Sequence, residues 1–306
     1  MPSISQEVQQ AIASVETEVA FGADTGFATR AAAIESLEIH VLDRLRYLEE
    51  SARLPPELLA LRAQATTLMR RLEAANEQVL HTLRRGIRSG AYTPSVLKRA
   101  LIRHAAPSEN RSGYDALDLL VGGLLDADGL PRERATREPE MVAYQPTPAR
   151  SILQLIERAN IGPADFLYDL GAGLGRVAIL VALLTGARAR GIEFEPAYCE
   201  YAQRCARRLT VSGVDFLQAD VRDAPLAEGT VYFLYTPFRG ELLRQVLERL
   251  RGEAGERLIR ICTYGPCTAV VAGATWLRHA DDRDLSEHEI AVFHLVPALR
   301  SMNLAK

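Results

Sequence analysis

The chain has 306 residues, of which 48% are hydrophobic and 25% charged, and its formal net charge is −3. This length is sufficient for two domains, and the composition is that of a folded globular protein, which excludes a mainly disordered chain, a collagen and a coiled-coil rod. The small net charge creates no overall field that would attract nucleic acid or an anionic membrane, so neither is expected as a partner.

The cysteines and the N-terminus point to the cellular setting. Cys199, Cys205, Cys262 and Cys267 show no CxxC spacing and no histidine at metal-ligand spacing, so we predict free thiols and no metal site. The N-terminus lacks the charged and apolar regions of a signal peptide. The longest apolar stretches fall short of the roughly 18 residues that a membrane span needs. We therefore predict a soluble, cytoplasmic protein.

The first part of the chain has a helical pattern. Apolar residues recur at three- and four-residue spacing over residues 34–48, and again over residues 58–83 after a break at Leu54-Pro55-Pro56. Two long helices with a short connection form an antiparallel hairpin. Shorter helices are expected at residues 94–104 and 114–125.

The charged stretch 126–139 contains two prolines and a glycine and is predicted to be a linker. The sequence therefore predicts an all-α N-terminal domain over residues 1–140. Its role is either a cap over the second domain or a dimerisation element, and a homodimer through residues 34–83 is one possibility.

After residue 141, short β-type runs alternate with helical patterns. Such alternation is typical of βαβ units, in which helices cover both faces of a parallel sheet. The last two strands are joined by a polar loop too short for a crossover helix, so they form an antiparallel hairpin. Over residues 141–306 we predict an α/β fold with a doubly wound, mostly parallel sheet of seven strands, at residues 166–170, 189–194, 214–218, 231–235, 258–263, 275–279 and 289–296.

The strongest motif is Asp169-Leu170-Gly171-Ala172-Gly173-Leu174-Gly175, which follows a predicted strand and opens a predicted helix at residues 175–184. Glycines allow a tight turn and the close approach of a ligand, and the helix start offers unpaired N–H groups. The spacing is GxGxG rather than GxGxxG, because residue 176 is an arginine.

Acidic residues stand at the ends of the next two strands. Glu193 ends the second strand and Asp220 follows the third. Ligands of open α/β sheets bind at the carboxyl ends of the strands, where a carboxylate accepts hydrogen bonds from ribose hydroxyls or from an adenine amine. Glu195 is an alternative to Glu193, but its place before Pro196 also suits a helix start.

Together these motifs resemble those of the class I S-adenosylmethionine-dependent methyltransferases, over about residues 143–296. The resemblance implies S-adenosyl-L-methionine as the cofactor. It implies that Gly171, Gly173 and Gly175 pack against its methionine part, that Glu193 holds the ribose and that Asp220 holds the adenine. Asp169 would orient the glycine loop or meet the cofactor's amine, and Gln218 and Val221 would border the adenine.

A narrower resemblance lies on either side of the glycine motif. Tyr144-Gln145-Pro146-Thr147 is similar to the Tyr-x-x-Thr segment of the non-SET histone lysine methyltransferase fold, in which the threonine lies against the methionine end of the cofactor. Residues 231–238 look like the strand that carries an (Asn/Asp)-Pro-Pro-(Tyr/Phe) segment in amino-group methyltransferases. Thr236 stands where that segment has Asn or Asp, a departure that puts an amine acceptor in question.

These residues define the expected reaction. Tyr235 and Thr236 follow the fourth strand and, with Phe238 and Tyr264, should line an acceptor pocket that Tyr144 closes. We expect a methyltransferase that acts on a nitrogen or oxygen atom of a small molecule or a protein side chain. The alternatives are a non-catalytic cofactor-binding regulator or scaffold, and a nicotinamide dehydrogenase, against which the glycine spacing argues.

Overall fold

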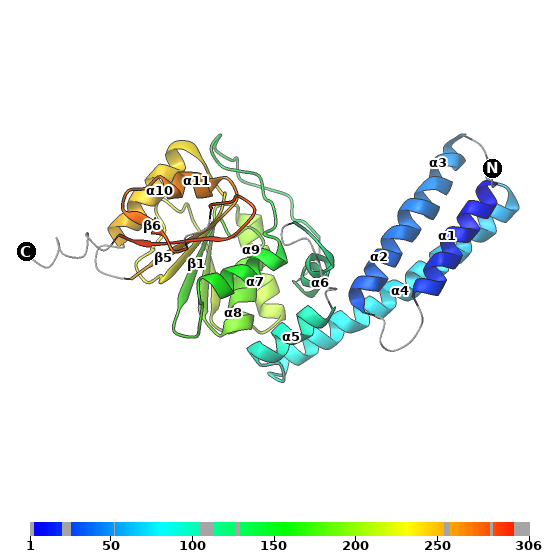
Figure 1. Ribbon diagram of the computed structural model, residues 1–306, viewed down its shortest axis with the longest axis horizontal. Coiled ribbons are helices and arrows are strands. Elements are labelled where there is room, and N and C mark those ends of the chain that lie inside the picture. Colours follow the sequence, from blue (N-terminus) through cyan, green and yellow to red (C-terminus); the bar gives the residue numbers. More distant parts are fainter. Residues whose placement is uncertain are drawn as a thin grey trace, which may run out of the picture. The chain divides into compact units, whose positions relative to one another are not determined.

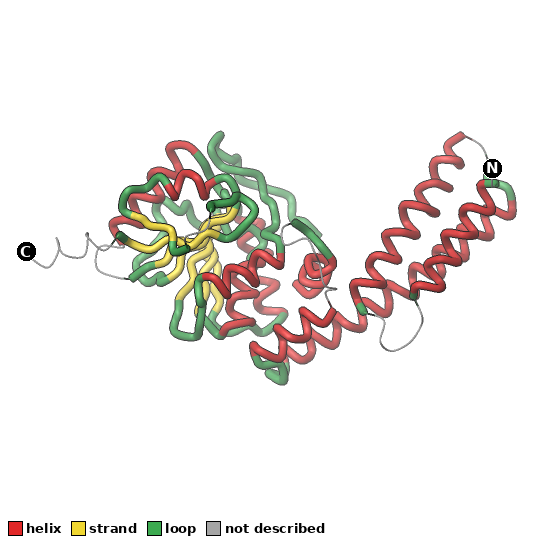
Figure 2. Tube along the Cα trace, in the orientation of Figure 1, coloured by secondary structure: helices red, strands yellow, loops and turns green. Residues whose placement is uncertain are grey.

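The structure is a computed structural model that describes residues 3–19, 26–51, 53–104, 113–125, 129–253, 258–281 and 284–296 (Figures 1 and 2). The chain forms two compact units. The first comprises Met1–Gly86, Arg99–Glu109 and Asp115–Leu124, and the second comprises Ile87–Lys98, Asn110–Tyr114 and Leu125–Lys306. A domain boundary at residue 140 stays a prediction.

The N-terminal part of the chain is helical, as predicted. Its elements are α1 (Ile4–Glu18), α2 (Phe27–Leu37), the π-helical turn η1 (Glu38–Asp43), α3 (Arg44–Ser51), α4 (Pro56–Arg88), α5 (Pro94–His104) and α6 (Ala116–Leu125). The helix expected from residue 34 begins earlier, at Phe27, and passes through η1. Helix α1 was not predicted, although its Ser3–Gln6 capping box is visible in the sequence.

The helices of this first unit are held by a core of their own. Leu37, Val41 and Leu45 recur at four-residue spacing, and all three are buried against Val8 and Leu72 of neighbouring helices. Burial of this stripe explains why the region folds as helices. Among the helices that the structure describes, none is long and apolar enough to cross a membrane. A homodimer through residues 34–83 stays a prediction.

The second unit contains the predicted seven-stranded sheet, with strand order β3-β2-β1-β4-β5-β7-β6. β1 to β5 run parallel, whereas β7 is antiparallel to both β5 and β6, which confirms the terminal hairpin. The strands are β1 (Phe166–Leu170), β2 (Arg188–Glu193), β3 (Val214–Gln218), β4 (Val231–Tyr235), β5 (Arg260–Tyr264), β6 (Leu277–His279) and β7 (Ala291–Leu295).

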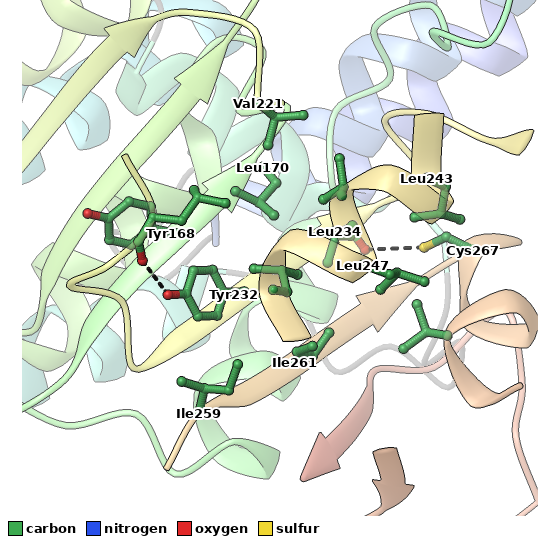
Figure 3. Close-up of a cluster of buried hydrophobic side chains, with 14 of the residues drawn as sticks. Tyr168, Leu170, Val221, Tyr232, Leu234, Leu243, Leu247, Ile259, Ile261 and Cys267 are labelled. Carbon is green, nitrogen blue, oxygen red and sulfur yellow. Dashed lines mark hydrogen bonds between the residues drawn. The ribbon is translucent and has the colours of Figure 1, made fainter. Parts of the chain in front are cut away.

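Helices cover both faces of this sheet (Figure 1). α8 (Arg176–Thr185) packs on β1 and β2, α9 (Pro196–Arg208) packs on β2 and β3, and α7 (Ala149–Arg158) packs on α8. The opposite face packs against α10 (Gly240–Glu253). Figure 3 shows part of that core, in which alternate residues of the strands, such as Tyr232 and Leu234, face Leu243 and Leu247 of α10.

In the sheet, the differences from the prediction lie at strand ends, and one short helix beside it was not predicted. β5 and β7 begin two residues later than expected, and β6 begins at Leu277 rather than at residue 275. The helix α11 (Cys267–Ala272) was not predicted, because six residues are too few to show a helical period.

The strand order places the site. β1 pairs with β2 on one side and with β4 on the other, so the loops that leave β1 and β4 diverge to opposite faces of the sheet. Such a switch point opens a crevice at the carboxyl ends of the strands, where ligands of doubly wound sheets bind. The glycine loop after β1 and the Thr236–Phe238 segment after β4 both lie at this point.

The close packing of β2 generates a test of the fold. A Cβ atom on Gly191 would lie 2.5 Å from Cδ1 of Phe216 and 2.7 Å from Cβ of Ala172. We expect Gly191→Ala to lower the free energy of unfolding by about 1–3 kcal/mol because the sheet has no room for the methyl group. Urea unfolding measures this, with Gly252→Ala as the control, since that methyl group meets no atom within 4 Å. Equal stability of the two variants would contradict the packing described.

Candidate functional site

A cavity of about 570 Å³ lies at the carboxyl ends of the strands, within the second unit. Its wall contains the ends of β1 and β2 and the segments that follow β1, β2, β3, β4 and β5. The predicted site residues that line it are Thr147, Tyr144, Asp169, Gly171, Gly173, Glu193, Asp220, Val221, Tyr235 and Thr236, together with Phe238 and Tyr264. Gln218 and Gly175 do not line the cavity.

Gly175 has a packing role instead. Its φ is +81°, a conformation that L side chains rarely adopt, and an added Cβ would lie 2.6 Å from Phe216 and 2.7 Å from Ala202. It is the residue immediately before α8, so its turn directs the chain from the loop into the helix. Contact with the methionine part of the cofactor, expected of Gly175 from the resemblance, stays a prediction.

Glu193 holds the glycine loop in shape. Its carboxylate is buried, Oε2 accepts a hydrogen bond from the Gly173 N–H (2.7 Å), and Oε1 accepts one from the Glu195 N–H (2.7 Å). Burial raises the pKa of Glu193, while these backbone hydrogen bonds lower it. One side chain thus connects the loop after β1 to the segment after β2, and each oxygen keeps a further lone pair for a ligand.

Asp169 is a buried carboxyl group on the same wall. Its Oδ2 atom has no hydrogen-bond partner among the residues that the structure describes. Burial, with a smaller contribution from the charge of Glu193, raises the pKa of Asp169 from 3.8 to about 8. A buried acceptor without a partner costs free energy, so this atom suits a ligand that donates a hydrogen bond or carries a positive charge.

Asp220 is positioned differently, because an arginine engages both of its oxygens. Oδ1 accepts from the Arg222 backbone N–H (2.8 Å), and Oδ2 lies 2.6 Å from the Arg222 guanidinium. The hydrogen bonds from the Arg222 side chain are the main cause that lowers the pKa of Asp220. Arg222 also pairs with Glu138 at 2.5 Å. Sequence reasoning found Asp220 but missed this pairing.

Residues 129–148, which we name the entry segment, run along the cavity. The structure has no helix or strand over 129–139, in agreement with the predicted linker, yet the segment is anchored at one end by Glu195. Oε2 of Glu195 accepts from the N–H groups of Arg134 (2.9 Å) and Ala135 (2.7 Å), while Oε1 caps α9 at the Ala197 N–H (2.8 Å). Glu195 is therefore both the helix-start acid and an anchor of this segment.

The other end of the entry segment is anchored at the switch point. The Glu140 carboxylate accepts hydrogen bonds from the N–H groups of Glu241 (3.0 Å) and Leu242 (2.7 Å), and so caps the start of α10. The Val142 N–H donates to the carbonyl of Pro237 (3.0 Å). These bonds place Tyr144 in the cavity wall, where a Cβ on Gly173 would lie 2.4 Å from its ring.

Tyrosines and Thr236 form the part of the wall that follows β4 and β5. The rings of Tyr235 and Tyr264 lie 4.8 Å apart at a tilt of 50°. Thr236 has a φ of +39°, a strained value for a β-branched residue, and its Oγ1 donates to the Tyr264 carbonyl (3.2 Å) and accepts from the Cys267 N–H (3.2 Å). Strain of this kind is typical of functional sites.

Several lining residues were missed by sequence reasoning. Tyr114 precedes α6, Tyr198 lies in the first turn of α9 with its ring 5.4 Å from that of Tyr144, and Glu287 and His288 come from the loop before β7. Tyr198 stands three residues after Glu195, at a predicted helix start, and this position could have indicated that Tyr198 lines the site. The other three lie outside any motif, so the sequence carried no signal for them.

Comparisons with known proteins agree with this geometry. A family model described as a methyltransferase domain matches residues 167–252. A protein-lysine N-methyltransferase of Saccharolobus islandicus is 30% identical over 112 residues, which cover 35% of this chain and 69% of that protein.

The chain is also similar to solved structures of methyltransferases that contain the cofactor or the product that the cofactor leaves. An RNA methyltransferase from Salinibacter ruber in complex with S-adenosyl-L-homocysteine shares 28% identity with a TM-score of 0.39, covering 49% of this chain and 92% of that one. Magnesium protoporphyrin IX methyltransferase from Synechocystis PCC 6803 with bound SAM shares 15% identity with a TM-score of 0.35, covering 47% and 74%.

The chain belongs to the class I S-adenosylmethionine-dependent methyltransferases. It is an enzyme whose cofactor is S-adenosyl-L-methionine. The expected methyltransferase is therefore confirmed over the two alternatives, a regulator and a nicotinamide dehydrogenase. The residues present fit this cofactor, because it carries an ammonium and a sulfonium charge. Asp169 offers a buried oxygen without a partner, and Glu193 is a second buried carboxylate on the same cavity.

The raised pKa of Asp169 generates a prediction about stability. Between about pH 4 and about pH 8 the folded protein keeps the Asp169 proton that the unfolded chain has lost, so this group makes stability fall as pH rises. Asp169→Asn stays neutral at every pH. We expect urea unfolding to show a smaller loss of stability from about pH 5 to about pH 8 in this variant than in the native protein. Parallel losses in both proteins would contradict the assigned pKa.

Proposed function

We propose that the enzyme methylates an amine nitrogen, and that its acceptor is a lysine side chain of a protein. The observation that carries the proposal is the aromatic and acidic character of the proposed acceptor part of the cavity. The Tyr235 and Tyr264 rings lie 4.8 Å apart at a tilt of 50°, and Glu287 lines the wall from the loop before β7. Aromatic faces and carboxylates favour a cationic acceptor. The relative from Saccharolobus islandicus, whose name states lysine N-methylation, supports the same choice.

The cofactor end of the cavity is proposed to work as follows. Asp169 Oδ2 holds the amino group of the cofactor, Gly171, Gly173 and Thr147 lie against its methionine end, and Glu193 accepts from the ribose. Asp220 and Val221 border the adenine. Because Arg222 already engages Asp220, that carboxylate keeps fewer lone pairs for the base than Glu193 keeps for the ribose.

The acceptor end is proposed to align the amine. The bound cofactor supplies the methyl group in an in-line displacement in which the amine lone pair forms the new C–N bond and the C–S electron pair returns to sulfur. Tyr235, Thr236 and Tyr144 are the proposed catalytic residues, because alignment of the reacting atoms is the main contribution that a protein makes to such a step. The lysine ammonium first loses one proton to water, because only the neutral amine carries the lone pair; the methyl transfer then leaves a methylated ammonium and a neutral thioether.

The cofactor assignment to these residues generates the first test. We expect Glu193→Gln to weaken binding of S-adenosylmethionine and S-adenosylhomocysteine by roughly 10- to 100-fold, the loss expected for hydrogen bonds to a buried carboxylate. Gly173→Arg should abolish binding, since even a Cβ there meets the Tyr144 ring. Calorimetry measures both, with NADH as the negative ligand and the exposed Glu248→Gln on α10 as the matched control. Unchanged affinity in both site variants would refute the assignment.

The acceptor requires a separate experiment. Lys98 and Lys306 are the only lysines of the chain, so the double variant Lys98→Arg, Lys306→Arg contains no lysine. Methyl-lysine recovered with this variant cannot come from methylation of the enzyme itself. With methyl-labelled S-adenosylmethionine, we expect this variant to label poly-lysine, with methyl-lysine recovered after acid hydrolysis, and to leave acetylated poly-lysine unlabelled. Base-labile methyl ester on poly-glutamate, with no label on poly-lysine, would show instead that the target is an oxygen.

A further inference from the structure

Arg176 follows the glycine loop directly and lines the cavity. It is the first residue of α8 and is partly buried. Its guanidinium donates a hydrogen bond to the carbonyl oxygen of Thr147 (3.2 Å), so it reaches from the start of the helix to the end of the entry segment. No role has yet been given to this arginine, although it contacts Thr147 and stands three residues after Gly173, both of which are assigned to the methionine end of the cofactor.

The methionine end of the cofactor carries two opposite charges. It ends in an α-amino acid group, in which one carbon bears both an ammonium and a carboxylate. The buried Oδ2 atom of Asp169, which has no partner among the residues that the structure describes, suits the ammonium. The carboxylate, however, enters a cavity whose wall already contains the carboxyl groups of Asp169 and Glu193. Burying a further acid there costs free energy unless a positive charge compensates it.

Arg176 places a positive charge at this end of the cavity. A guanidinium presents its N–H groups in a planar fork that matches the two oxygens of a carboxylate. The start of α8 adds to the effect, because the first N–H groups of a helix carry partial positive charge. We propose that Arg176 binds the carboxylate of the cofactor while Asp169 binds the ammonium, so that the two residues select a cofactor with an intact amino acid group. This inference rests on the proposed placement of the methionine end.

A second arginine of the cavity offers a matched comparison. Arg137 belongs to the entry segment and lies 3.2 Å from the carboxylate of Glu133, which also accepts a hydrogen bond from the Tyr198 hydroxyl (2.8 Å). The charge of Arg137 therefore has a compensating acid within its own segment. The same substitution at Arg137 and at Arg176 removes one arginine from one cavity, and only the loss of Arg176 should be felt by the carboxylate of the cofactor.

The test uses a ligand that lacks a single group. Decarboxylated S-adenosylmethionine keeps the adenosine, the sulfonium and the amine, but it has no carboxylate. We expect Arg176→Gln to weaken binding of S-adenosylmethionine by about 10- to 100-fold, as for lost hydrogen bonds between charged groups, and to leave the affinity for the decarboxylated ligand unchanged. Calorimetry on the full chain measures both affinities. Arg137→Gln should leave their ratio at the native value, and binding of the decarboxylated ligand shows that the Arg176 variant is folded.

Asp169→Asn separates this inference from the placement on which it rests. Both ligands carry the ammonium, so we expect the loss of the Asp169 charge to weaken binding of both. If it does so, and Arg176→Gln weakens the two ligands equally or weakens neither, Arg176 does not bind the carboxylate and the inference is overturned. Unchanged affinity for both ligands in Asp169→Asn would instead overturn the proposed placement of the methionine end.

Discussion

The carboxylate of Glu193 is the contact on which the cavity depends. It accepts a hydrogen bond from the loop after β1, at Gly173, and another from the segment after β2, at Glu195. Because Glu195 in turn caps α9 and anchors the entry segment, one buried acid connects three parts of the wall. Removing it leaves buried N–H groups without partners, which costs more than the bonds themselves contribute.

The same arrangement explains why the cavity suits a cationic cofactor. Asp169 and Glu193 line one cavity, and burial raises the pKa of both carboxyl groups; the charge of Glu193 adds to the rise at Asp169. Backbone N–H groups stabilise Glu193, whereas Asp169 has an oxygen without a partner. The charge of Asp169 is therefore the one without a compensating partner. A positively charged ligand would offset both the cost of burying that charge and the repulsion from Glu193.

The succession of strands and helices along the chain and the position of the glycine loop were predictable from the sequence because both depend on local patterns. A short apolar run marks the strand at residues 166–170, and glycines mark the turn after it, where the structure gives all three a positive φ. The pairing of Asp220 with Arg222 and the anchoring of Glu140 to α10 were not predictable, because side-chain partners depend on loop conformation rather than on period. Residues such as Tyr114 and His288 enter the site through tertiary folding alone.

The difference between residues placed by strand ends and residues placed by loops has a consequence for the choice of methyl acceptor. The cofactor half of the cavity is built from strand ends, so its motif residues follow from the sheet and define the class of enzyme. The proposed acceptor half also uses the entry segment, whose Pro146 carbonyl accepts a hydrogen bond from the Tyr114 hydroxyl (2.6 Å). Glu195 holds that segment through backbone N–H groups of the segment, which any sequence supplies, whereas Glu140 anchors it to α10 through its own side chain. Apart from Glu140, side chains along the segment can therefore vary while its path is kept, so the proposed acceptor half can change without loss of the cofactor half.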